Sequence, residues 1–247
     1  MKNQARIKYL YFRDIVNIVK ACNIEARLHI EEDRIWLKCV DISNVMMVNL
    51  NIPKSVFESY SLKPQVIGID FAKLSTFSNM TYGYVDIIQG FKDLDDTFDI
   101  KFESGKYNLT IKNGLDITTI KKEPNDFNEE ILDTSAIVSS PSVRKFLKEV
   151  KKESSRVKIS IVSGDLYFNA YDESEYIYEF VTRDAVSSLD SNAKTSLYSI
   201  EYIIDCFKYV KGDVEILMGT DKPCKISFGL DGINIGSYVL APRIEGD

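Results

Sequence analysis

Histidine, serine and carboxylate side chains carry most enzyme chemistry, and here they form no recognisable catalytic set. The 247 residues contain one histidine, His29, which we expect to be a solvated or half-buried strand residue. Paired-histidine metal ligands are therefore excluded, and a serine–histidine–aspartate triad would depend on that one residue. Neither GxxxxGK[ST] nor GxGxxG occurs. Acidic pairs such as Glu31-Glu32 and Asp95-Asp96 indicate surface charge, so a carboxylate-dependent hydrolase is only a remote alternative.

The four cysteines are scattered through the chain without CxxC pairing. This usage favours small buried thiols in a reducing compartment over disulfides or a metal site. We expect no metal and no cofactor. No apolar run approaches the roughly 20 residues of a membrane span, and no signal peptide is predicted. These features predict a cytoplasmic protein that contacts no membrane, or a nuclear one if the source is eukaryotic.

Basic side chains gather on the flanks of predicted helices although the chain is acidic, with net charge −6. Arg13 and Lys20 flank one apolar helical stripe, and the helix SVRKFLKEVKKES repeats that arrangement. Such a flank could contact phosphates without reading bases, and its binding would weaken with salt. A solvated helix surface is the alternative interpretation. The candidate DNA-binding residues are Arg13, Lys20, Lys73, Arg144, Lys145, Lys148, Lys151, Lys208 and Lys211.

An internal repeat organises the chain. LHIEEDRIWLKCVD, which ends at Asp41, aligns with ISIVSGDLYFNAYD, which ends at Asp172, and YVDIIQ aligns with DVEILM at nearly the same separation. Colinear similarity of this length predicts two like domains, residues 1–116 and 133–247. The polar stretch 117–132, interrupted by Pro124, predicts the linker between them.

Each repeat is rich in strand signals and contains two helical patterns. Alternating segments, such as 157–161 and 226–230, predict antiparallel strands. Asn113-Gly114, Ser163-Gly164-Asp165 and Asp231-Gly232 predict hairpin turns. Apolar stripes predict two longer helices, and shorter ones fit residues 71–80 and 199–211. The fold class is therefore α+β, with two similar domains of antiparallel sheet carrying two helices each.

The whole chain resembles the sliding clamps of archaea and eukaryotes, the proliferating cell nuclear antigen family. The resemblance is carried by LKCVDISNVMMVNLNIP, SLYSIEYIIDCFK, ISFGLDG and the terminal YVLAPRIE. It implies a DNA clamp fold in which three subunits close a ring around double-stranded DNA, with the helices lining the hole. Ring closure in that family pairs edge strands, and the matching positions are Leu115, Ile117, Tyr176, Tyr178 and Phe180.

The resemblance also implies that short peptide motifs of partner proteins dock on the outer face. The expected partners are a replicative DNA polymerase, a clamp loader, a flap endonuclease and a DNA ligase. Val239 and Asn44 depart from the side chains that the family often carries. The matching peptide-binding positions are Val40, Asn44, Val45, Met47, Ile120, Phe127, Pro223, Leu240, Ala241, Pro242 and Arg243.

The leading hypothesis is a non-enzymatic processivity factor, a homotrimer or a heterotrimer with sister subunits. The alternative within the same architecture is a subunit of a heterotrimeric or checkpoint-type clamp. We expect an archaeal source on the strength of the resemblance.

Overall fold

The computed structural model describes residues 3–76, 83–89, 98–104, 107–171, 177–183, 185 and 193–243. The chain divides into two compact units. Unit 1 comprises Met1–Ile42 and Val48–Pro124, and unit 2 comprises Ser43–Met47 and Asn125–Asp247. The predicted linker, residues 117–132, therefore spans the division after Pro124 instead of lying outside both units.

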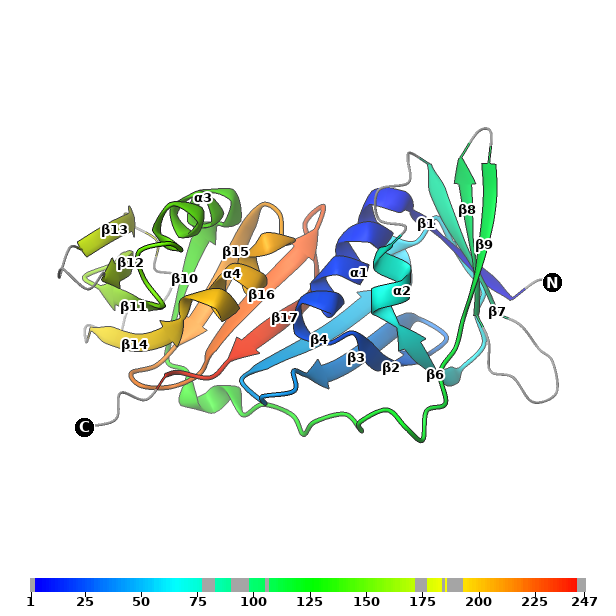
Figure 1. The fold of residues 1–247 in the computed structure, drawn as a ribbon, viewed down its shortest axis with the longest axis horizontal. Helices are drawn as coiled ribbons and strands as arrows, with labels where there is room; N and C mark the ends of the chain where they lie inside the picture. Colours follow the sequence, from blue (N-terminus) through cyan, green and yellow to red (C-terminus); the bar gives the residue numbers. More distant parts are fainter. Residues whose placement is uncertain are drawn as a thin grey trace. The chain divides into compact units, whose positions relative to one another are not determined.

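Unit 1 contains two sheets with two helices on the same side of the strands (Figure 1). One sheet has the order β5-β1-β7-β8-β9, and in the other β4, β3, β2 and β6 are neighbours. The elements are β1 Gln4–Lys8, α1 Tyr9–Cys22, β2 Glu25–Ile30, β3 Arg34–Val40, β4 Met46–Pro53, a 3-10 turn Lys54–Val56, β5 Ser59–Tyr60, β6 Gln65–Asp70, α2 Phe71–Ser75, β7 Tyr84–Gln89, β8 Phe98–Ser104 and β9 Tyr107–Asn113.

Unit 2 repeats this plan, with the strand orders β10-β15-β16-β17 and β13-β12-β11-β14. The strands whose register is described pair antiparallel. The elements are a 3-10 turn Glu129–Ile131, β10 Thr134–Ser139, α3 Ser140–Val150, β11 Arg156–Val162, β12 Asp165–Tyr171, β13 Ile177–Thr182, β14 Lys194–Ser199, α4 Ile200–Lys208, β15 Asp213–Met218, β16 Cys224–Leu230 and β17 Ile233–Leu240.

The predicted repeat is confirmed element by element. Strands β3 and β12 start 131 residues apart, at Arg34 and Asp165, as do helices α1 and α3. Strands β7 and β15 are the YVDIIQ and DVEILM segments. The α+β class with mostly antiparallel hairpins is therefore correct.

The apolar stripes of the long helices form the cores. Phe12, Ile15, Val16 and Val19 of α1 are buried, and so are their counterparts Val143, Phe146, Leu147 and Val150 of α3. In unit 2 the Phe168 and Phe207 rings meet edge to face at 6.2 Å, which joins α4 to β12. The four cysteines are buried free thiols, as predicted.

Two predicted hairpin turns are confirmed by their backbone geometry. Ser163 and Gly164 have φ of 52° and 91°, and Asp231 and Gly232 have φ of 47° and 83°. Two successive positive φ values are the geometry of a tight hairpin turn. Asn113-Gly114 was predicted wrongly, because β9 ends at Asn113 and the chain continues into the linker.

The shorter helices differ in length from their predictions. Helix α2 ends at Ser75, and the remainder of the predicted 71–80 segment lies outside the described residues after position 76. Helix α4 covers Ile200–Lys208 rather than 199–211. The chain leaves that helix before Gly212, whose positive φ of 67° is not helical.

Gly68 of β6 packs against the segment that runs from β9 into the linker. A Cβ at this position would lie 2.5 Å from the Leu115 carbonyl oxygen and 2.6 Å from Cδ1 of Ile120. We predict that Gly68→Ala lowers the free energy of unfolding by about 1–3 kcal/mol through overpacking. Urea denaturation checks this, and an unchanged midpoint would contradict the close approach.

Candidate functional site

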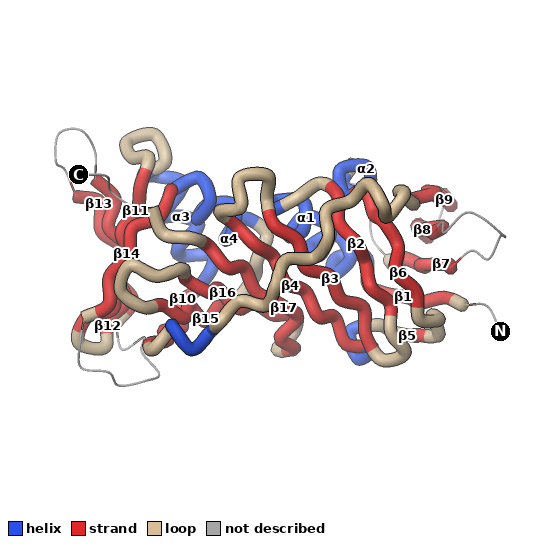
Figure 2. Tube along the Cα trace, turned by 90° about the horizontal axis from the view of Figure 1, so that it is seen from below, coloured by secondary structure: helices blue, strands red, loops and turns tan. Residues whose placement is uncertain are grey.

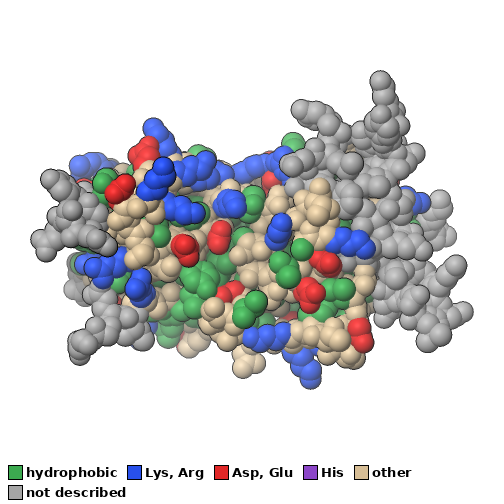
Figure 3. Space-filling view, viewed as in Figure 1, with side chains coloured by type: hydrophobic (Ala, Val, Ile, Leu, Met, Phe, Trp, Pro, Cys, Tyr) green, Lys and Arg blue, Asp and Glu red, His purple; other side chains and the backbone are tan. Residues whose placement is uncertain are grey.

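The exposed flank of α3 carries the largest group of accessible cations in the candidate set. Lys145, Lys148 and Lys151 are exposed, while the opposite stripe of the same helix is buried. Lys and Arg side chains gather over the edge of unit 2 where α3 lies (Figure 3). Lys208 and Lys211 add exposed cations at and just beyond the end of α4. We call these five lysines the basic flank.

Arg144 does not belong to this accessible group. Its guanidinium donates from Nη1 to the Lys208 carbonyl at 2.9 Å and from Nη2 to the Val210 carbonyl at 3.4 Å. Carbonyls at a helix C-terminus lack helical partners and favour a nearby cation. Arg144 therefore caps the end of α4, and its DNA-binding role stays a prediction.

The candidate cations of unit 1 are more strongly engaged than those of α3. Arg13 pairs with the buried Asp14, with Nη2–Oδ1 at 3.0 Å, and the Lys20 ammonium donates to the Ser75 hydroxyl at 2.7 Å. Lys73 is exposed on α2. Arg13 is thus partly neutralised, which reduces the positive potential that the first repeat can offer.

One carboxylate interrupts the basic flank. Asp205 lies on α4, where burial raises its pKa, Lys208 and Lys151 oppose that rise, and Glu201 adds to it. The net effect is a pKa above the ordinary aspartate value.

A polar hollow of about 720 Å³ adjoins the C-terminal end of α3. Its lining includes Lys151, Lys152, Arg156 and Arg243, with Glu153 and Glu201 as the acidic members. Sequence reasoning did not group Arg156 and Arg243 with the lysines. The chain turn after α3 and the C-terminal tail bring them together, and no helical period could have indicated this.

The C-terminal tail and the segment Ser43–Met47 lie together within unit 2. The Ala241 N–H donates to the Val45 carbonyl at 2.9 Å, and the Arg243 N–H donates to the Leu197 carbonyl at 2.7 Å. Met46 is buried, with its Sδ 3.5 Å from Cys206 Sγ. The exposed and half-buried members form what we call the tail–loop surface: Asn44, Val45, Met47, Pro223, Ala241, Pro242 and Arg243.

Four other predicted peptide-binding residues fall outside this surface. Leu240 is fully buried, paired with Cys224 across β16 and β17. Ile120 is only 6% exposed and packs over Gly68 in unit 1, and its predicted place in the peptide-binding site stays a prediction. Val40 is half-buried in unit 1, and Phe127 is half-buried in unit 2.

Sequence reasoning did not single out Ile42, which is 95% exposed and directly precedes Ser43. An isolated isoleucine within the polar turn DISN was the available signal. Ile42 belongs to unit 1, and the segment Ser43–Met47 that follows it belongs to unit 2.

The predicted subunit-interface residues lie in different parts of the two units. Leu115 donates its N–H to the Gly68 carbonyl of β6 and Ile117 accepts from Arg27, so both lie beyond the end of β9. Strand β9 is one edge of the five-stranded sheet in unit 1, and β13 is one edge of the four-stranded sheet in unit 2. Phe180 turns its ring toward Phe146 and Phe168, whereas Tyr178 is exposed. Tyr176 lies outside the described residues.

Within the described ranges, no three or more His, Cys, Asp or Glu side chains gather in a way that could hold a metal ion. In those same ranges, no helix is both long enough and apolar enough to cross a membrane.

The family model and the related sequences that match this chain agree on one family. Residues 5–125 match the family described as proliferating cell nuclear antigen, N-terminal domain. The chain is 33% identical over 255 residues to a DNA polymerase sliding clamp of Methanocorpusculum labreanum, with 99% of each chain covered. It is 30% identical over 241 residues to a DNA polymerase sliding clamp of Methanosphaerula palustris, with 96% of each covered.

Solved structures share the fold over the full length. The complex of the C-terminal region of FEN-1 bound to A. fulgidus PCNA matches with a TM-score of 0.87 at 24% identity, covering 100% of each chain. The PCNA2–PCNA3 complex from Sulfolobus tokodaii matches with a TM-score of 0.82 at 16% identity, covering 97% of this chain and 99% of that one. These likenesses support the two-unit architecture described above.

The different roles of Arg144 and Lys148 can be tested by measuring the free energy of unfolding of variants. We predict that Arg144→Ala lowers the free energy of unfolding by about 1–2 kcal/mol, because it leaves helix-end carbonyls without their cation. Lys148→Ala, on the exposed flank of the same helix, should change it by less than about 0.5 kcal/mol. Urea denaturation measures both, and equal effects would remove the distinction between cap and flank.

Proposed function

We propose that this chain, which belongs to the DNA polymerase sliding clamp family, encircles duplex DNA and tethers replication and repair enzymes to it. The observation that carries the proposal is the exposed lysine row of α3, Lys145, Lys148 and Lys151, in a chain of net charge −6. Positive charge is concentrated on a helix flank while the chain as a whole is acidic. That distribution suits a protein that holds DNA on one surface only.

The basic flank is suited to sliding contact. Separate ammonium groups on long side chains reach phosphates without reading base edges, so each contact is weak and independent of sequence. Their common dependence on counterion release makes binding sensitive to salt. We therefore assign DNA contact to Lys145, Lys148, Lys151, Lys208 and Lys211, with Lys20 and Lys73 from unit 1, and we leave out Arg144.

Ring closure would use the free edges of β9 and β13. An unpaired edge strand exposes backbone N–H and C=O groups and invites pairing with another chain. Head-to-tail pairing of one edge with the other, repeated by rotation, closes a ring without leaving an edge. We propose three subunits per ring, and Tyr178 is the exposed apolar side chain at the β13 edge.

The tail–loop surface is the proposed docking site for partner peptides. Its half-buried side chains come from two segments that a backbone hydrogen bond joins, Ala241 to Val45. The related A. fulgidus clamp has been solved with the C-terminal region of FEN-1 bound, which supports the same class of partner here. We extend the proposal to a replicative polymerase, a clamp loader and a DNA ligase, and we add Ile42 to the surface.

We further propose that the chain acts without catalysis of its own. His29 is hydrogen-bonded to Glu123, and the function requires only binding and assembly. The archaeal sources of the relatives support our proposal of an archaeal, cytoplasmic setting.

A heterotrimeric clamp is the second candidate. One of the solved structural relatives is a PCNA2–PCNA3 complex of unlike subunits. The two candidates differ in whether the isolated chain assembles. Analytical ultracentrifugation at tens of micromolar should give a trimer for the first candidate and a monomer or dimer for the second.

The lysine row can be tested by charge reversal. We predict that Lys148→Glu with Lys151→Glu reduces clamp-dependent polymerase synthesis at least about threefold. It should also lower the slope of log affinity for duplex DNA against log salt by about 2, because two phosphate contacts are lost. Fluorescence anisotropy over a salt series measures the slope.

The matched control is Lys54→Glu with Lys63→Glu, which changes the net charge equally on loops of unit 1. Both double variants should sediment like the unmodified protein. Equal losses in the two variants would mean that total charge, rather than the basic flank, governs DNA contact.

Nested truncations test the docking surface. Removing residues 241–247 takes away Ala241, Pro242 and Arg243 while retaining Leu240, which completes β17. We predict that the FEN-1 C-terminal peptide then binds at least about tenfold more weakly, because part of an apolar docking site is gone. Removing only residues 244–247 is the control and should leave affinity unchanged. Isothermal titration calorimetry distinguishes these outcomes.

A further inference from the structure

The polar hollow at the C-terminal end of α3 lies wholly within unit 2. Its charged lining consists of four cations and two carboxylates: Lys151, Lys152, Arg156, Arg243, Glu153 and Glu201. The lining therefore has a formal charge of +2, in a chain of net charge −6. Positive charge gathered around a concave surface raises the local concentration of anions.

Three adjacent strand ends contribute to this lining. Strand β11 begins at Arg156, β12 ends at Tyr171 and β14 ends at Ser199, and the three strands are neighbours in one sheet (Figure 2). Arg156 is directly opposite Ser199. The Lys158 ammonium lies 5.5 Å from the centroid of the Tyr171 ring, which helps to orient that ring. The register of the sheet therefore sets where this side of the hollow lies.

The turn that follows α3 is held by its own hydrogen bonds. The Ser154 N–H donates to the Val150 carbonyl at 3.0 Å. The Ser154 hydroxyl donates to the Arg156 carbonyl at 2.7 Å and accepts from the Arg156 N–H at 3.1 Å. The Ile200 N–H donates to the Ser155 carbonyl at 3.1 Å, which joins the turn to the start of α4. Because this backbone is already ordered, binding of a ligand in the hollow costs little conformational entropy.

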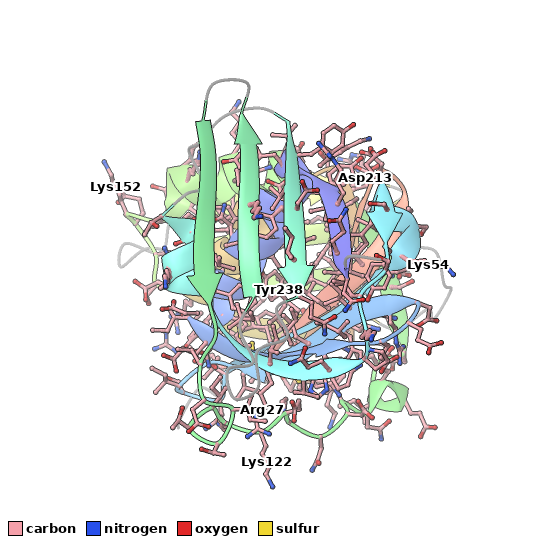
Figure 4. All side chains as sticks on the ribbon, turned by 90° about the vertical axis from the view of Figure 1, so that its right-hand side faces the viewer. Arg27, Lys54, Lys122, Lys152, Asp213 and Tyr238 are labelled. Carbon is pink, nitrogen blue, oxygen red and sulfur yellow. The ribbon has the colours of Figure 1, made fainter. Side chains whose placement is uncertain are left out.

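Two of the cations are exposed on segments whose backbone is fixed. Lys152 extends outward from the turn after α3 (Figure 4). Arg243 is also exposed, and its backbone N–H donates to the Leu197 carbonyl of β14 at 2.7 Å. This differs from Arg144, whose guanidinium is used on the carbonyls that end α4. The charged ends of Lys152 and Arg243 are therefore accessible to an anion from solvent.

The first turn of α4 adds hydrogen-bond donors. Ser199, Ile200 and Glu201 line the hollow at the start of this nine-residue helix, and the Ser199 side chain makes no capping hydrogen bond. The first N–H groups of a helix lack partners within the helix and favour a nearby anion. Glu201 offsets part of this potential. The helix end and the Ser199 hydroxyl thus supplement the four cations.

The composition of the lining distinguishes between classes of anion. Of the described residues that line the hollow, one is aliphatic, Ile200, and one is aromatic, Tyr171. A docked peptide depends on apolar anchors in well-packed pockets, and this lining offers few. A planar guanidinium can donate two parallel hydrogen bonds to one phosphate, which a lysine cannot do. Two arginines among hydroxyls and lysines therefore favour a phosphate over an acidic peptide.

We propose that the polar hollow binds a phosphate monoester, the group carried by a nucleotide or by the 5′ end of a DNA strand. Arg156 and Arg243 donate to the phosphate oxygens, and Lys151 and Lys152 balance the remaining charge. A phosphate monoester carries about −1.5 to −2 charges at pH 7, which matches the formal charge of the lining better than the single charge of a phosphodiester does. Only Lys151 is shared with the basic flank, so the hollow is a second site.

The test is isothermal titration calorimetry of the full-length protein with thymidine 5′-monophosphate, and thymidine is the ligand control. We expect saturable binding of the monophosphate with a Kd below about 1 mM, and no binding of thymidine. Arg156→Ala should weaken binding at least about tenfold, because hydrogen bonds from a charged group are lost. Arg156→Lys keeps the charge without the planar fork, so it should recover only part of the affinity.

The matched control is Lys222→Ala, which removes a cation from the exposed turn between β15 and β16, outside the hollow. Its affinity for the monophosphate should equal that of the unmodified protein. Because Arg156 begins a core strand, Arg243→Ala on the exposed tail is a second variant, and it should weaken binding at least about threefold. Circular dichroism checks that each variant is folded.

A second titration identifies the source of the phosphate. A short oligothymidine with a 5′-phosphate is compared with the same strand ending in a 5′-hydroxyl, so that contacts between the basic flank and the phosphate backbone cancel. At least about tenfold tighter binding of the phosphorylated strand assigns the site to a strand end. Equal binding of the two strands, with the monophosphate still bound, assigns it to a free nucleotide.

Three results would overturn the proposal. The first is a failure of the monophosphate to bind. The second is binding that Arg156→Ala and Arg243→Ala leave unchanged, which would place the phosphate elsewhere on the protein. The third is tighter binding of hexaglutamate than of the monophosphate, which would make the hollow a site for acidic peptides. Neither duplex DNA nor the FEN-1 peptide is used, so these outcomes are separate from those that test the proposed function.

Discussion

The burial of one apolar stripe per long helix is the constraint on which each unit depends. The stripes of α1 and α3 are buried against the strands of their own units, and each fully buried aliphatic or aromatic side chain contributes about 1.5–3 kcal/mol. Once that stripe is fixed, the rest of the helix must face solvent. The orientation of α3 that buries Phe146 and Leu147 therefore exposes Lys145 and Lys148 to solvent. Packing of the core thus determines on which side of the helix the positive charge lies.

Charge type alone does not reveal which cations are available for binding. Arg144 and Lys148 are one turn apart on α3, yet Arg144 is used on the carbonyls that end α4. A planar guanidinium with several donors suits two carbonyls at once, whereas a lysine on the exposed flank remains a solvated point charge. Arg13 and Arg27 follow the same rule, since each is engaged inside unit 1. These three arginines are held by contacts within their own units, whereas Lys145, Lys148 and Lys151 are exposed.

The sequence predicted the helices and strands whose pattern repeats within one short segment. It did not predict contacts between residues that are far apart in the chain. Periodicity located α1, α3 and β17, because alternation and helical stripes are contained within one segment. The family resemblance placed Leu115 and Ile117 on an edge strand, whereas the chain leaves β9 at Asn113 and folds back over Gly68. Arg27 and Ile117 are 90 residues apart, and His29 and Glu123 are 94 apart. Pairs at such separations leave no periodic trace, so the linker appeared to be only a polar spacer.

The sheet of unit 1 restricts which residues can stand in the first part of the linker. Positions 115–123 must accommodate Gly68, two carbonyl bonds to Arg27 and a carboxylate that meets His29. A bulky or uncharged replacement there would act on unit 1 before it acted on any partner. After Pro124 the ion pairs are with unit 2, where Glu129 pairs with Lys225 and Asp133 pairs with Lys194. The linker is therefore attached to unit 1 before Pro124 and to unit 2 from Glu129 onward, and only the few residues between these positions lie outside both sets of contacts named here.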